Sequence, residues 1–85
     1  MRRRKIDKDE LAAVIEDHRK WLESGGERGT KADLSGRDLS RQNLQQANFE
    51  RANLEGINLD RTNLRTANFK AANLNAASMV EANLQ

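Results

Sequence analysis

The feature that most constrains this chain is a five-residue repeat that begins at Ala32. Residues 32–85 divide without an insertion into eleven units, the last of which is one residue short. The third position of each unit is large and apolar, the first is usually small, and the second is Asn in eight units. The third positions are Leu34, Leu39, Leu44, Phe49, Leu54, Leu59, Leu64, Phe69, Leu74, Met79 and Leu84.

A period of five excludes a continuous helix or strand for this segment. Successive third positions would rotate by about 140° on an α-helix, and they would point to alternate faces of a strand. The chain must therefore turn once in every unit. The first and third residues then point inward, the residue between them points outward, and the third positions form a core ladder.

Features that recur at a spacing of twenty residues indicate how many units close one coil. Phe49 is followed twenty residues later by Phe69, whereas a fifteen-residue coil would stack Phe49 on Leu64. Four units to a coil is therefore the better fit. The same spacing would place opposite charges beside each other on neighbouring coils, namely Glu50 with Lys70 and Arg61 with Glu81.

The A-(D/N)-L-x-x units of residues 32–85 resemble those of the pentapeptide-repeat family, over about two thirds of the chain. The resemblance implies an all-β solenoid, a right-handed quadrilateral β-helix. Eleven units would then make about 2.75 coils. With the segment that precedes the repeats, the predicted fold is this β-helix and one N-terminal amphipathic capping α-helix.

The residues before the repeat predict a basic N-terminal tail at 1–6, a capping helix at 7–25 and a linker at 26–31, all in one structural domain with the repeat at 32–85. Asp7 and Glu10 have the spacing of a capping box, and a glycine pair at 25–26 would end the helix.

One face of the predicted helix carries the apolar side chains that would cover the open end of the first coil. Covering that end protects unpaired strand groups from aggregation. Arg37 and Gln42 occupy nominally inward first positions in that coil, and we expect them to reach outward or toward the helix. The predicted packing residues of the helix are Leu11, Ile15, His18, Trp21 and Leu22.

The inventory of reactive side chains indicates a protein that is not an enzyme. Cysteine is absent and His18 is the single histidine, so neither a thiolate metal site nor a Ser-His-Asp triad is suggested. We expect His18 to be a packing residue with one satisfied ring nitrogen, and the Asn column to serve the turns. No catalytic, metal or cofactor-binding residue is predicted. The lack of cysteine and of a membrane-length apolar run suits a cytoplasmic location.

Charge is distributed evenly along the chain. Residues 1–30 carry 8 basic and 7 acidic side chains, and residues 31–85 carry 7 and 6. Neither part offers the field of one sign that is typical of a nucleic-acid binder. The run Arg2–Lys5 is the strongest candidate for phosphate contact, but the acidic residues behind it favour a solvated end. Nucleic acid is therefore not an expected partner.

Two functions remain after these exclusions. The first is a scaffold or protein-interaction module with a partner that the sequence does not identify. The second follows from the resemblance, because some pentapeptide-repeat proteins bind type II topoisomerases such as gyrase by imitating DNA. The short repeat and the net charge of +2 disfavour that alternative.

The last units are the predicted place for an interaction. Outward positions become less polar there, and tail-to-tail dimers occur in proteins of the family that the chain resembles. A homodimer through the C-terminal coil is therefore one expectation. A frayed end and a cut-down longer repeat array are the alternatives. The candidate interface residues are Ala71, Ala76, Val80 and Leu84.

Overall fold

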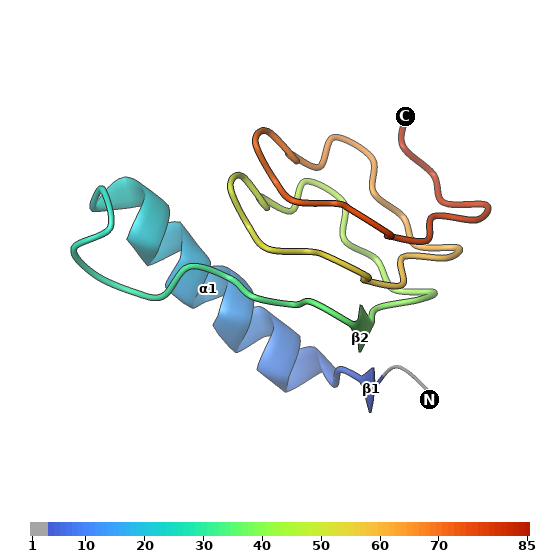
Figure 1. Ribbon diagram of the computed structural model, residues 1–85, viewed down its shortest axis with the longest axis horizontal. Coiled ribbons are helices and arrows are strands. Elements are labelled where there is room, and N and C mark those ends of the chain that lie inside the picture. The colour runs from blue at the N-terminus through green and yellow to red at the C-terminus, as the bar shows by residue number, and fades with distance from the viewer. Residues whose placement is uncertain (1–3) are drawn as a thin grey trace.

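The computed structural model of the chain describes residues 4–85, which form one helix and a β-solenoid (Figure 1). Strand β1 (Arg4–Lys5) precedes helix α1 (Lys8–Glu23), and β2 (Arg37–Asp38) lies in the first coil. Figure 1 shows α1 across one end of the stacked coils, while the C-terminus lies at the other end. No helix within the described residues is long and apolar enough to cross a membrane.

Residues twenty positions apart lie side by side in the solenoid. Seven isolated parallel bridges join second positions in this register, the first of them Asp33 with Asn53. At a typical bridge, the Asn63 N–H donates to the Gln42 carbonyl at 2.9 Å and the Leu44 N–H donates to the Asn63 carbonyl at 2.8 Å. The ladder is therefore built from backbone hydrogen bonds between neighbouring coils.

Side chains on neighbouring coils follow the same register. The rings of Phe49 and Phe69 stack with their centroids 5.7 Å apart. The predicted contact of Arg61 with Glu81 is confirmed, with Nε and Oε1 2.9 Å apart. Glu50 lies beside Lys70 in the same register, since the Arg51 N–H donates to the Lys70 carbonyl at 2.8 Å. The Glu50 carboxylate accepts from Asn68 Nδ2 at 3.4 Å.

Two local features turn the chain in its repeat units. Except at Ser78, the second-position side chain accepts a hydrogen bond from the backbone N–H two residues later, as Asn58 Oδ1 does from the Asp60 N–H at 2.9 Å. The fifth residue adopts a positive φ in all ten complete units, from Gly36 at 68° to Glu81 at 59°. This left-handed residue closes a β-turn, in which the N–H of the next unit donates to the preceding third-position carbonyl. The predicted structural role of the Asn column is confirmed.

The third-position side chains are buried from the first coil to Leu64. Phe69, Leu74 and Met79 are half-buried against this core. Leu84 differs from its predicted place in the core ladder because 57% of it is exposed. Within the described residues, no further coil stacks on its outer side. The buried members are Leu34, Leu39, Leu44, Phe49, Leu54, Leu59 and Leu64.

The helix begins where the capping residues place it. Asp7 is the N-cap, and its Oδ1 accepts from the Glu10 N–H at 2.9 Å, which confirms the predicted cap. At the other end, the Ser24 N–H donates to the Lys20 carbonyl at 3.0 Å, and Gly25 follows in a left-handed conformation.

The segment before the helix departs from the predicted basic tail. Residues 1–3 of that tail lie outside the described residues. Arg4 and Lys5 pair with Arg37 and Asp38 of the first coil, and the Ile6 N–H donates to the Asp38 carbonyl at 3.1 Å. Ile6 is buried in the same apolar cluster as Leu11. Because this apolar side chain anchors it, the strand forms despite its two cationic residues.

The linker packs closely against α1 at Gly29. Its φ is +72°, and a Cβ placed there would lie 2.2 Å from the Asp17 carbonyl oxygen and 2.7 Å from the Trp21 nitrogen. Gly36 has a similar φ of +68°, but a Cβ there would meet nothing within 4 Å. A side chain at Gly36 would therefore meet backbone strain alone, whereas one at Gly29 would meet both strain and a steric clash.

We expect Gly29→Ala to lower the free energy of unfolding much more than Gly36→Ala. The second substitution should cost only the left-handed conformation, about 1–2 kcal/mol, while the first must also displace the linker from α1. Urea denaturation of both variants measures the difference. Equal costs would show that the linker does not need its close contact with the helix.

Candidate functional site

His18 joins the helix to both ends of the first coil. Its Nδ1 accepts from the Ala32 N–H at 2.9 Å, and its Nε2 lies 2.8 Å from the Glu50 carbonyl oxygen. A backbone N–H only donates and a carbonyl only accepts, so these contacts require a neutral ring with its proton on Nε2. The sequence led us to expect one satisfied nitrogen, whereas both are used. The side chain is fully buried and stacks on Trp21.

The other predicted packing residues of the helix lie on the same side of α1. Leu11 is 4% exposed, whereas Ile15, Trp21 and Leu22 are half-buried. Ile15 packs against the cluster of buried apolar residues in the first coils. The helix therefore covers only part of the coil opening.

Arg37 and Gln42 reach from the first coil toward the N-terminal segment, as predicted. The Arg37 guanidinium contacts both Glu10 carboxylate oxygens, at 3.0 and 3.1 Å. These hydrogen bonds hold the pKa of Glu10 below its usual value and raise that of Arg37. Gln42 Nε2 donates to the Ile6 carbonyl at 3.4 Å.

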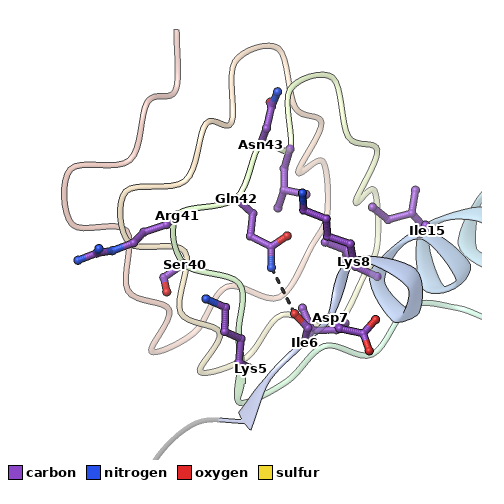
Figure 2. Close-up of a pocket in the computed structure, with 12 residues that line it drawn as sticks. Lys5, Ile6, Asp7, Lys8, Ile15, Ser40, Arg41, Gln42 and Asn43 are labelled. Carbon is purple, nitrogen blue, oxygen red and sulfur yellow. Dashed lines mark hydrogen bonds between the residues drawn. The ribbon is translucent and has the colours of Figure 1, made fainter.

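A groove of ≈ 860 Å³ remains between the N-terminal segment and the third unit of the first coil, residues 42–46. We call it the helix groove; Figure 2 shows the Gln42 side chain extending across it to Ile6. Apolar side chains from both sides line it, with cationic side chains at its rim. Its lining residues are Lys5, Ile6, Asp7, Lys8, Leu11, Ala12, Ile15, Ser40, Arg41, Gln42, Asn43 and Leu44.

The coil edge beside the helix groove has free backbone groups. Within the described residues, neither the N–H nor the carbonyl of Asn43 has a hydrogen-bond partner on the helix side. In the preceding unit, the corresponding carbonyl of Asp38 accepts from Ile6 of the N-terminal segment. We refer to these free groups of Asn43 as the Asn43 edge.

The candidate residues of the predicted C-terminal interface lie one in each of the last four units. Val80 and Leu84 are the large hydrophobic side chains that residues 4–85 leave exposed, at 61% and 57%. Ala71 and Ala76 are exposed as well, each at the left-handed fifth position of its unit. All four residues are exposed, and the last units lie at the end of the solenoid opposite α1, where the ribbon is orange to red in Figure 1.

The His, Asp and Glu side chains of residues 4–85 do not gather in one cluster. Across residues 4–85, no group of three or more His, Asp or Glu side chains is placed to hold a metal ion. The carboxylates Glu55 and Glu81 are exposed, and Glu81 is paired with Arg61.

Comparison with known proteins identifies the repeat. A family model described as pentapeptide repeats matches eight copies, over residues 30–65 and 47–85. No curated protein matches the chain.

We expect His18→Phe to destabilise the fold, because the Ala32 N–H and the Glu50 carbonyl would lose their buried partners at about 1–3 kcal/mol each. Urea denaturation measures the loss. NMR of the unaltered protein with 15N-labelled histidine should show the proton on Nε2. A proton on Nδ1 would contradict the two hydrogen bonds.

We expect Glu10→Gln to destabilise the protein at neutral pH more than in acid. The folded pKa of Glu10 lies below its ordinary value of 4.5. Its stabilising effect is therefore present above that value and is lost as the pH falls through the lowered one. Urea denaturation at both pH values measures it. In an Arg37→Gln background the pH-dependent difference should disappear, and its persistence would assign the effect to another group.

Proposed function

The chain belongs to the pentapeptide-repeat family, and from that premise we propose that it is a non-enzymatic protein-interaction module. A protein-interaction or scaffold role is what the family suggests. The observation that carries the proposal is the exposure of Val80 and Leu84, which lie four residues apart in the last two units. Large exposed apolar side chains this close in the chain support a contact surface for another protein.

The proposed scaffold is a right-handed quadrilateral β-helix of about 2.75 coils. The twenty-residue offset of the parallel bridges supports four units to a coil. Such a scaffold presents outward side chains in rows at the spacing of adjacent strands, about 4.8 Å. The lack of cysteine supports a reducing, cytoplasmic setting for it.

A second copy of the chain is one proposed partner for the surface around Val80 and Leu84. Pairing of two such surfaces would bury the half-exposed core of the last units, including Met79. Light scattering at high protein concentration tests this assignment. A strictly monomeric species would leave a different protein as the partner.

The alternative of a DNA mimic that binds a topoisomerase is disfavoured by charge. Imitation of DNA requires rows of negative charge, whereas Arg41, Arg51, Arg61 and Arg65 are exposed on the solenoid. Dose-dependent inhibition of gyrase supercoiling at low micromolar protein would favour the DNA mimic over the general interaction module.

We expect affinity capture from the source cell to recover a protein partner, and Val80→Gln to reduce that recovery at least about tenfold. The matched control is Asn75→Gln, because Asn75 occupies the same exposed fourth position of its unit. Recovery that is equal for both variants would exclude this surface. Failure of the unaltered protein to capture any protein would contradict the interaction function itself.

A further inference from the structure

We propose that the helix groove binds an extended acidic peptide of a partner protein, which adds to the Asn43 edge as a parallel strand. The inference rests on the proposed interaction function and names the chemistry of the partner. It concerns the α1 end of the solenoid, so it is independent of the surface around Val80 and Leu84.

The first support is that the N-terminal segment already binds the first coil in this way. β1 pairs in parallel with β2, in the register Lys5 to Asp38. The Ile6 N–H then donates to the Asp38 carbonyl at 3.1 Å, and Ile6 is buried over the coil opening. Arg4–Ile6 thus acts as a partial unit of a preceding coil. The chain leaves this path at Asp7, where α1 is capped, so the next unit lacks an equivalent strand.

The second support is that the Asn43 edge is free, whereas the Asp38 carbonyl of the preceding unit already accepts from the Ile6 N–H. Within the described residues, the N–H and the carbonyl of Asn43 are both without hydrogen-bond partners. Free strand edges are templates for another strand, and extended peptides bind many proteins by this route. A strand here would continue the row of β1 on the adjacent unit.

The coil ladder predicts the register of such a peptide. Between coils, the Asn63 N–H donates to Gln42 and the Asn63 carbonyl accepts from Leu44. By the same geometry, one peptide carbonyl would accept from the Asn43 N–H, and the residue two positions later would donate to the Asn43 carbonyl. Those two residues correspond to first and third positions, whose side chains point inward. They would lie over Gln42 and Leu44, opposite Leu11 and Ile15, and should therefore be apolar.

The charge of the rim indicates the rest of the peptide. Lys5, Lys8 and Arg41 line the groove, and Asp7 is the acidic residue among the lining side chains. The Asp7 carboxylate is already bound to the first turn of α1. The rim therefore attracts carboxylates that flank the apolar pair.

A single-stranded nucleic acid fits these features less well. The lining contains no aromatic side chain on which a base could stack. A phosphate could accept from the Asn43 N–H, but it would leave the Asn43 carbonyl without a donor. A peptide backbone satisfies both groups.

The test uses a fluorescein-labelled synthetic peptide in which Ile and Val alternate with Glu, added to the full chain. Fluorescence anisotropy should show saturable binding that weakens with salt, and hydrogen exchange of the Asn43 amide should slow when the peptide is bound. A peptide of the same sequence should bind at least about tenfold more weakly when its paired backbone nitrogens are methylated.

Two pairs of variants locate the site. Ala12→Trp would fill the groove from an exposed helix position, whereas Ala13→Trp adds the same side chain outside the lining. Arg41→Glu alters the rim, and Arg51→Glu changes an exposed arginine at the same left-handed fifth position outside the groove. We expect Ala12→Trp to weaken binding at least about tenfold, Arg41→Glu to weaken it about threefold or more, and the two controls to leave it unchanged.

Several results would overturn the proposal. These are absence of binding, equal binding to Ala12→Trp, equal binding of the methylated peptide, and tighter binding of a single-stranded oligonucleotide. The interaction function is judged separately by affinity capture. If Ala12→Trp captures the same cellular partner as the unaltered chain, the groove proposal fails and the interaction function stands. If no protein is captured while the peptide binds at the Asn43 edge, the interaction function fails and the groove remains a peptide site.

Discussion

The hydrogen bond that the Asn or Asp side chain at the second position accepts from the backbone N–H two residues later sets the path of this chain. It bends the backbone just after the inward third residue, as Asn58 does for Asp60 at 2.9 Å. The left-handed fifth residue then completes the turn. Since both features recur every five residues, the third-position side chains line one interior and neighbouring coils meet in register. The Phe49–Phe69 stack and the Arg61–Glu81 ion pair are consequences of that register.

A chain that turns in this way leaves an open coil at its start. The N-terminal segment covers some units of that coil and leaves others uncovered. β1 supplies backbone partners to one unit, and His18 supplies partners to Ala32 and Glu50 where the coil begins and ends. α1 runs between these two attachments. The third unit lies outside both, and the helix groove with its free Asn43 edge is one part of the opening that remains.

Much of the repeat was predictable because its signals are local and recur. The inward ladder, the Asn turns and the helix cap at Asp7 each follow from residues within five positions of one another. The pairing of Arg4 and Lys5 with the first coil was not predicted, because it joins residues more than thirty positions apart. Ile6 is the apolar residue that could have indicated this pairing, but the cationic residues before it favoured the prediction of a solvated tail.

The candidate surfaces were predictable to different degrees, because one is marked by local sequence and the other depends on contacts between distant residues. Val80 departs from the polar fourth positions of other units, so the sequence indicates it directly. The helix groove depends on where α1 leaves the path of β1, and only the fold brings Ile15 and Leu44 to the same cavity. The second hydrogen bond of the His18 ring was not predicted. Its partner, the Glu50 carbonyl, is a backbone group, so no side chain in the sequence indicates it.

The distribution of side chains also bears on how this solenoid would recognise a partner. Along the outward faces, exposed arginines alternate with carboxylates such as Glu55 and Glu81, so a partner that docks on a face meets mixed, solvated charge. Exposed ion pairs contribute little binding energy. The Asn43 edge instead offers backbone hydrogen bonds, which contribute affinity, beside an apolar cavity that selects the inward side chains of a bound strand. Recognition of a strand at this end of the solenoid would therefore use the same backbone ladder that holds its coils together.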